Sequence, residues 1–339
     1  MRKYLFLCPQ CSAITDLTKC DVCGYQIPQV GGIYKFCEDG NLRLDGENQY
    51  IGYDNIGENF EPTSIYYGND RYGVYEACGD LIAQTLGTNI TVLDLGAGLG
   101  SASIPLAQKG IFTIAVDISE KMLSVAVNRA KEQFNNLIFA RMNAYRLMIP
   151  DNSIDIVIEN ALLHLVDNPE KVIREITRVL KPNGKLIRYT SPAKSLTNIE
   201  RKQRDDGNRV LSDISERYYA YLNEKGYQNV YFDNRHQEHI ELNFDFPYYV
   251  NAENFEEVFT DKVKFRLHRL QTGAHSDLQN IPQAVLDMAW QYVHTYAVNK
   301  YGENYKETKG FARYGAALEV YPLKNIARNE NKVSSIESY

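Results

Sequence analysis

Residues 91–100 read TVLDLGAGLG, an apolar run that ends in a turn with three glycines. The run is typical of a buried strand, and Gly96, Gly98 and Gly100 let the backbone bend sharply and approach a ligand without a Cβ in the way. A dinucleotide site has the spacing G-x-G-x-x-G before a helix that points at a pyrophosphate. Here the spacing is G-x-G-x-G after Asp94, which favours a ligand without phosphate. Asp94 is well placed to meet a positively charged amino group.

Short apolar runs alternate with helical patterns between residues 90 and 190, which is typical of βα units in a mostly parallel sheet. We expect strands at 91–95, 112–116, 137–141, 154–159 and 185–189. We expect helices at 102–109, 119–133 and 168–180, the last opened by Asn168 and Pro169. These elements predict an α/β fold with a doubly wound sheet, whose ligand crevice lies at the carboxyl ends of the strands.

A second carboxylate lies at the end of the next predicted strand. Asp117 follows Gly100 by seventeen residues, a position from which an acid accepts both hydroxyls of a ribose. Ser119 is explained as the cap of the following helix. An ordinary turn acid is the other interpretation of Asp117 alone. Because two ligand-facing features stand at neighbouring strand ends, the sequence favours a nucleoside site.

These motifs, with the runs at 143, 151–164 and 178–187, resemble the class I S-adenosylmethionine-dependent methyltransferases of the small-molecule type over roughly residues 88–190. The resemblance implies a Rossmann-like sheet that binds S-adenosyl-L-methionine and transfers its methyl group by in-line displacement to a small-molecule acceptor. It implies cofactor contacts by Asp94, Gly96, Ala97, Gly98 and Gly100 on the methionine side, Asp117 at the ribose, Ile118 and Met122 near the adenine, and Asn143 and Ala144 at the adenine amino group. Where the family usually has an acid, this chain has Asn143, whose amide oxygen can still accept a hydrogen bond.

The strand at 154–159 ends in Glu159-Asn160-Ala-Leu-Leu-His164, where the resembled enzymes place residues beside the reactive sulfonium. Methyl transfer has a neutral leaving group, so the protein mainly has to align donor and acceptor. If the acceptor carries a proton, His164 is the natural general base, and a capping or core-packed histidine is the alternative. Glu159 is the second catalytic candidate, and Glu159 and Asn160 are also expected to contact the cofactor.

Two CxxC pairs stand near the N-terminus, Cys8-Pro-Gln-Cys11 and Cys20-Asp-Val-Cys23. Two such turns supply the four thiolates of a closed, structural Zn²⁺ site. A segment of this size has too little core to fold without a metal. Two disulfides or four free thiols are the alternatives.

The stretch CPQC…CDVCGYQIPQVGGIYKF resembles the Trm112-like family of small zinc ribbons. More loosely, it resembles the ribbon fused to the large-subunit rRNA guanine-N1 methyltransferases. The resemblance implies a docking or stabilising module rather than a catalytic one. Cys37 and Cys78 lie outside the pattern and are interpreted as small apolar residues.

The chain is expected to consist of a zinc ribbon at 1–40, an arm over the cofactor site at 41–87, a methyltransferase domain at 88–324 and a flexible tail at 325–339. Tyr53, Tyr67 and Arg71 of the arm could contact the donor, and packing onto the sheet is the other explanation for the tyrosines. After residue 190 we expect a helix near 213–225 and strands near 229–232 and 316–321 that finish the sheet with an antiparallel edge. An α/β insertion at about 233–312, which includes Phe246-Pro-Tyr-Tyr249, is interpreted as a lid over the acceptor.

Composition limits the function. Of the 339 residues 44% are apolar, and the formal net charge is -6. A basic surface would favour nucleic acid, so this balance counts against an RNA acceptor. The apolar run before Cys8 is too short for a signal peptide or a membrane span, so we expect no membrane contact and a reducing, cytoplasmic setting.

Three functions therefore stand in order. The first is a methyltransferase with a small-molecule acceptor. The second, suggested by the ribbon, is an rRNA/tRNA or translation-factor methyltransferase. The third is a non-catalytic protein that binds S-adenosylmethionine or activates a partner. The accepting atom and the oligomeric state do not follow from the sequence.

Overall fold

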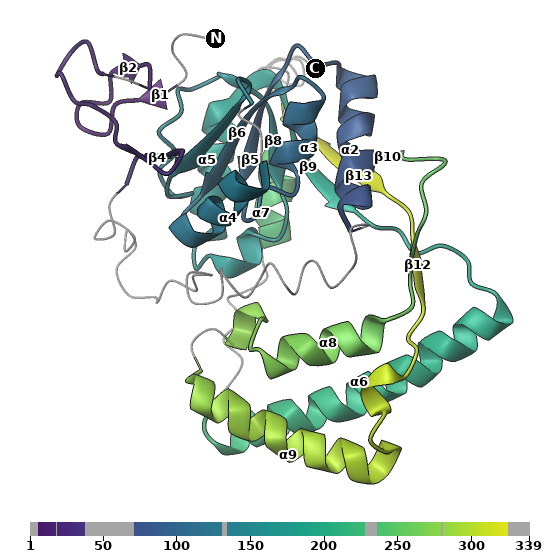
Figure 1. Ribbon diagram of the computed structural model, residues 1–339. Helices are drawn as coiled ribbons and strands as arrows, with labels where there is room; N and C mark the ends of the chain where they lie inside the picture. The colour runs from purple at the N-terminus through teal and green to yellow at the C-terminus, as the bar shows by residue number, and fades with distance from the viewer. Residues whose placement is uncertain are drawn as a thin grey trace, which may run out of the picture.

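A computed structural model describes residues 6–17, 19–37, 71–130, 134–227, 236–278 and 281–324. The main element is a nine-stranded mixed sheet with the order β10-β13-β9-β8-β5-β6-β7-β4-β3, covered by helices (Figure 1). The expectations for the arm at 41–70, including Tyr53 and Tyr67, for the side chain of Arg71, for a strand near 229–232 and for the tail fall outside the described residues.

Five parallel strands form the centre of the sheet: β5 (Thr91–Leu95), β6 (Phe112–Asp117), β7 (Leu137–Arg141), β8 (Ile154–Glu159) and β9 (Leu180–Thr190). Their order, β9-β8-β5-β6-β7, runs outward from β5 in both directions, so the predicted doubly wound arrangement is confirmed. Every residue of β5 is buried, as expected for a strand covered on both faces.

Helices lie on both faces of this centre. They are α2 (Arg71–Leu86), α3 (Ser103–Gln108), α4 (Glu120–Ala130), α5 (Pro169–Val179) and α7 (His236–Asn243). Alternate residues of β5 belong to two different apolar clusters, Leu93 and Leu95 to the one that contains α5 and α7, and Val92 to the one that contains α2 and α3. The α5 helix begins as predicted, because Asn168 Oδ1 accepts the Lys171 N–H and Pro169 stands in the first turn.

An antiparallel pair completes one side of the sheet. The predicted last strand is β13 (Ala317–Pro322), which pairs antiparallel with β9. Its other neighbour is β10 (Tyr248–Asn251), so Tyr248 and Tyr249 belong to the sheet edge and not to the lid in which the sequence placed them. An aromatic and β-branched run such as Tyr-Tyr-Val suits a half-exposed edge strand.

The N-terminal ribbon contains β1 (Phe6–Leu7), β2 (Ile14–Thr15), β3 (Gln29–Val30) and β4 (Ile33–Lys35). The ribbon is the purple segment in Figure 1, beside the edge of the sheet. Strand β4 pairs in parallel with β7, and β3 pairs with β4, so the ribbon adds two strands to the main sheet. Phe6, Ile27 and Phe36 enter the largest apolar cluster. The sequence predicted the ribbon and gave no sign of this pairing.

A helical layer lies below the sheet in Figure 1. It consists of α6 (Asn198–Glu224), α8 (Lys262–Gln271) and α9 (Gln283–Tyr301), packed around a separate apolar cluster that includes Tyr218 and Trp290. The strands β11 (Glu257–Phe259) and β12 (Ala312–Tyr314) connect it to the sheet, and the short 3₁₀ segments are η3 (Leu163–Leu165), η4 (Ser276–Leu278) and η5 (Tyr305–Glu307).

The layer differs from the insertion expected at 233–312, because α6 precedes that range while α7 and β10 pack on the sheet. The expected helix at 213–225 is the second half of α6, which begins much earlier at a capping box formed by Thr197 and Glu200. No helix in the described ranges is long and apolar enough to span a membrane.

Candidate functional site

The glycine turn after β5 has a backbone that other residues rarely adopt. Gly96, Gly98 and Gly100 have φ angles of 76°, 51° and 72°, all in the left-handed region. The Gly96 N–H donates to the Val116 carbonyl of β6 at 2.8 Å, which fixes the turn against the next strand. A Cβ at Gly96 would lie 3.1 Å from the Leu162 Cβ. The turn therefore needs glycine both for its conformation and for its space.

Asp117 stands beside this turn, at the carboxyl end of β6. Its Oδ2 accepts the Gly98 N–H and its Oδ1 accepts the Ser119 N–H, both at 2.8 Å. Ser119 in turn accepts the Met122 N–H at 3.2 Å, in agreement with its predicted role as a helix cap. These bonds hold a carboxylate at the rim of the glycine turn, where the sequence placed it.

Asp94 is more enclosed than the sequence indicated. Its side chain is 3% exposed and accepts a hydrogen bond from the hydroxyl of Ser103, the first residue of α3. Burial, and to a smaller extent the charge of Asp117, raises the pKa of Asp94 to about 6. Asp94 thus has a buried partner that the sequence analysis missed, and a cation near it would favour its ionised form.

The residues assigned to the adenine follow β6 and β7. Met122 is buried, and its Cε lies 3.3 Å from the position of a Cβ on Gly98. Ile118 and Ala144 are half-buried. Asn143 is buried, and its Oδ1 accepts the Tyr145 N–H at 2.9 Å. The amide oxygen of Asn143 therefore has one lone pair left for a ligand.

Glu159 closes β8 and is 2% exposed. Its Oε1 accepts the backbone N–H groups of Leu162 and Leu163, and its Oε2 forms an ion pair with Arg188 of β9 at 2.7 Å. Both oxygens have protein partners, which favours a positioning role over proton transfer. An arginine inside the apolar strand pattern at 185–189 was the signal that could have revealed this pair.

The turn after Glu159 is strained. Ala161 has a φ angle of 62°, uncommon for a residue with a Cβ and often found at functional sites. Asn160 Oδ1 accepts the Tyr189 N–H at 2.8 Å, whereas Asn160 Nδ2 is buried and has no hydrogen-bond partner among the described residues. His164 lies in η3 and is half-buried.

A cavity of about 510 Å³ opens at the carboxyl ends of β8 and β9, large enough for a small organic molecule. Its walls come from these strand ends and η3, from α2, from β11 and β12, and from α8; they include Asn160, His164, Arg188, Tyr189, Tyr75, Glu257, Lys262, Arg266 and Tyr314. The sequence predicted Asn160 and His164 here and missed the tyrosines, Glu257 and the cations, because they come together only through tertiary packing.

The Tyr189 hydroxyl is a second buried group without a hydrogen-bond partner in the described part of the chain. Burial raises the pKa of Tyr189 well above its ordinary value, and the nearby charges of Cys78 and Asp94 act in the same direction. Unpartnered buried polar atoms are costly, and here two of them border one cavity. A bound molecule would satisfy both.

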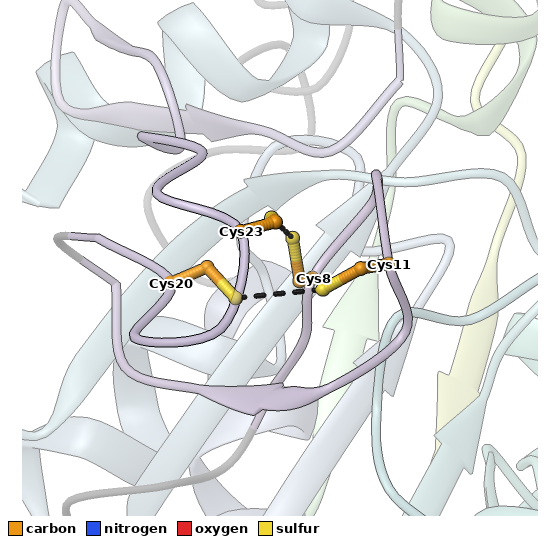
Figure 2. A group of neighbouring side chains, drawn as sticks. All are labelled: Cys8, Cys11, Cys20 and Cys23. Atoms are coloured by element: carbon orange, nitrogen blue, oxygen red, sulfur yellow. Dashed lines mark hydrogen bonds between the residues drawn. The ribbon is translucent and has the colours of Figure 1, made fainter.

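The four N-terminal cysteines meet at one point (Figure 2). Cys8 and Cys23 have sulfurs 3.5 Å apart, as do Cys11 and Cys20, and all four sulfurs lie within 4.8 Å of one another. A disulfide needs about 2.05 Å, whereas tetrahedral zinc with Zn–S bonds of about 2.3 Å separates its sulfurs by about 3.8 Å. The spacing fits a tetrahedral metal site and does not fit two disulfides.

The loops around the sulfurs support this interpretation. The backbone N–H of Cys23 is the main cause that lowers the pKa of Cys20 to about 7, which favours the thiolate. Gly24, at a φ angle of 75°, donates its N–H to the Cys20 carbonyl and so closes the second turn. Cys78, outside the cluster, is buried in the core, as expected for a small apolar residue.

Comparisons with known proteins concern mainly the sheet. Residues 93–188 match the family described as methyltransferase domain. Demethylmenaquinone methyltransferase of Tropheryma whipplei (strain Twist) is 38% identical over 96 residues, 28% of this chain and 39% of the relative. The 27-O-demethylrifamycin SV methyltransferase of Amycolatopsis mediterranei (strain S699) is 32% identical over 207 residues, 58% of this chain and 73% of the relative.

The chain thus spans well under half the length of the demethylmenaquinone enzymes that it matches. Among solved structures, the PH0226 protein from Pyrococcus horikoshii OT3 is 20% identical, with 76% of this chain and 91% of that chain covered and a TM-score of 0.39.

Proposed function

This chain belongs to the class I S-adenosylmethionine-dependent methyltransferases, and from that premise we propose that it methylates a small-molecule acceptor. Two relatives, by their names, act on demethylmenaquinone and on 27-O-demethylrifamycin SV. The observation that carries the proposal is the meeting of three left-handed glycines with Asp117 at the carboxyl ends of β5 and β6, one strand away from the 510 Å³ cavity.

The residues of the turn fit the donor. The missing Cβ atoms of Gly96 and Gly98 leave room for close approach of a ligand, and Asp117 offers a carboxylate to the ribose hydroxyls. Ile118 and Met122 would pack on the adenine, with Asn143 and Ala144 at its amino group. S-adenosyl-L-methionine would supply a methyl group on a positively charged sulfur. The ionised form of Asp94 would complement the amino group of the methionine part.

The cavity fits the acceptor. Asn160 Nδ2 and the Tyr189 hydroxyl would orient a bound molecule, because each is a buried polar group without a partner in the described residues. Glu159 would position Arg188 and the backbone of η3. His164 would receive a proton if the accepting atom carries one. The α8 helix contributes Lys262 and Arg266 to the wall, so we assign the helical layer the role of a lid.

A titration of the full chain with S-adenosylhomocysteine tests the donor site. We expect saturable one-site binding by isothermal titration calorimetry, and no displacement by NAD⁺, because the turn lacks the dinucleotide spacing. Displacement by NAD⁺, or no binding of S-adenosylhomocysteine at all, would overturn the proposal.

Tyr189→Phe separates a ligand contact from a structural one. Removing a buried hydroxyl that has no protein partner should leave the melting temperature of the unliganded protein unchanged or slightly higher. Affinity for S-adenosylhomocysteine or for the acceptor should fall by about threefold to tenfold, the range for one neutral hydrogen bond. Calorimetry and thermal unfolding, with Tyr248→Phe at the sheet edge as the control, measure both. A lower melting temperature with unchanged binding would contradict the prediction.

The raised pKa of Asp94 predicts a pH dependence of donor binding. Asp94 is mostly protonated at pH 5 and ionised at pH 7, since its pKa is about 6. A cationic amino group favours the ionised form, so affinity for S-adenosylhomocysteine should rise about tenfold from pH 5 to pH 7. In the unliganded protein the sign is opposite: the stabilisation from a raised carboxyl pKa is complete below pH 4 and is lost as the pH rises through 6. Asp94→Asn should flatten both profiles; a pH-independent affinity of the unchanged protein would refute the contact.

For the ribbon we propose a structural Zn²⁺ held by Cys8, Cys11, Cys20 and Cys23, in a module that resembles the Trm112-like ribbons. The support is the clustering of the four sulfurs and the spacing of the two CxxC turns. Two of the four, Cys8 and Cys20, are buried, as expected for a closed site without a catalytic position.

A further inference from the structure

A second, smaller cavity of about 340 Å³ adjoins the acceptor cavity. The two share Lys262, Ala312 and Tyr314 in their walls, so the smaller one is a side pocket of the larger. The chain after β9, the first turns of α6, the first residue of α8 and β12 surround it.

The side pocket is strongly cationic. Its lining contains five basic residues and no acidic one: Lys194, Arg201, Arg204, Lys262 and Arg313. The larger cavity, by contrast, has Glu159, Glu257 and Glu319 beside its cations. The whole chain has a net charge of -6, so this concentration of positive charge is local and opposes the overall balance.

Only part of this charge is neutralised by the protein. Arg313 forms ion pairs with Glu200 and Glu256, and Arg204 pairs with Asp205. Lys194, Arg201 and Lys262 have no carboxylate partner within the described ranges.

Lys262 has only an amide neighbour. Its Nζ contacts Asn208 Oδ1 at 3.3 Å, and the adjacent acid, Asp261, is paired with Lys309. Burial and the positive charges of Arg266 and Arg204 lower the pKa of Lys262. The surroundings thus disfavour the charged ammonium, and a bound anion would reverse that.

We propose that this side pocket binds an oxyanion group of the acceptor, a carboxylate or a phosphate ester, while the atom to be methylated lies in the larger cavity. The inference rests on the proposed function, because it names the substrate class of the same site. Arginine and lysine bind such groups through charge-assisted hydrogen bonds, and a concave pocket holds one group of this size. An extended nucleic acid would instead need a basic strip, which a pocket of this size does not provide.

Titration of the full chain with inorganic phosphate and, separately, with acetate tests the pocket, at ionic strength held constant with sodium chloride. We expect saturable binding of at least one anion, and the tighter one identifies the group. Lys262→Gln and Arg201→Gln should each weaken this binding about tenfold, as for the loss of one charge-assisted contact. Lys202→Gln is the matched control, because Lys202 is exposed on the same helix as Arg201 and does not line the pocket.

Binding of S-adenosylhomocysteine by each variant shows that it is folded and separates the two hypotheses. If the donor binds and the anions do not, or if both pocket variants bind anions like Lys202→Gln, the side pocket is not an anion site and the proposed function stands. If the unchanged protein binds no donor, the proposed function fails whatever the anions do. Tight binding of a short single-stranded RNA that is lost in Lys262→Gln would replace the small-molecule inference with an RNA acceptor.

Discussion

Asp117→Ala should weaken the binding of S-adenosylhomocysteine by at least about a hundredfold. Two charge-assisted hydrogen bonds from a ribose diol to a carboxylate contribute about 1.5 to 3 kcal/mol each. The substitution also removes the acceptor for the N–H groups of Gly98 and Ser119, so the glycine turn loses its attachment to β6. Both effects act in the same direction. Calorimetric titration of the full chain measures the loss.

Two further variants make this result interpretable. Asp117→Asn retains an oxygen acceptor and should fall between the unchanged protein and the alanine variant. Asp151→Ala removes a carboxylate that is mostly exposed and pairs only with Arg178 in the turn before β8, so its affinity should not change. Near-normal affinity of a folded Asp117→Ala variant would show that the ribose is held elsewhere.

Removing zinc should destabilise more than the ribbon. Structural zinc contributes about 10 kcal/mol or more to the folding of small zinc modules. Here Phe6, Ile27 and Phe36 from the ribbon pack in the largest apolar cluster, so loss of the ribbon exposes part of the main core. We expect a chelator, or Cys20→Ser, to lower the melting temperature by roughly 10 °C, the effect of losing about 3 to 5 kcal/mol in a domain of this size.

Elemental analysis provides the matching control. The unchanged protein and Cys37→Ser should each contain one zinc per chain, because Cys37 lies outside the sulfur cluster. Cys20→Ser should contain none. Equal melting temperatures with and without metal would show that the ribbon is held by its apolar contacts alone.

The sequence predicted what depends on local pattern. The strands β5, β7 and β8 begin and end at the predicted residues, because each is a short apolar run bounded by turn residues. The left-handed glycines and the cysteine cluster follow from equally local spacing. Strand β9 starts earlier than predicted, at Leu180, because the turn at 181–184 is included as an irregularity in its pairing with β8.

What the sequence could not predict depends on contacts between distant segments. Arg188 and Glu159 lie on neighbouring strands, and nothing in their spacing along the chain indicates an ion pair. The side pocket joins residues of α6, α8 and β12, which come together only when the helical layer packs. Short apolar runs such as Ile33–Lys35 carry too little pattern to reveal that they join a sheet.

The pairing of β4 with β7 also constrains the order of assembly. Ile33 lies opposite Phe139, a separation of 139 - 33 = 106 residues. A ribosome therefore releases the first strand long before its neighbour exists, and closing so long a loop is slow. During synthesis the early segment waits with its backbone groups unsatisfied, and a bound ion would keep it ordered until the later strand emerges and captures it.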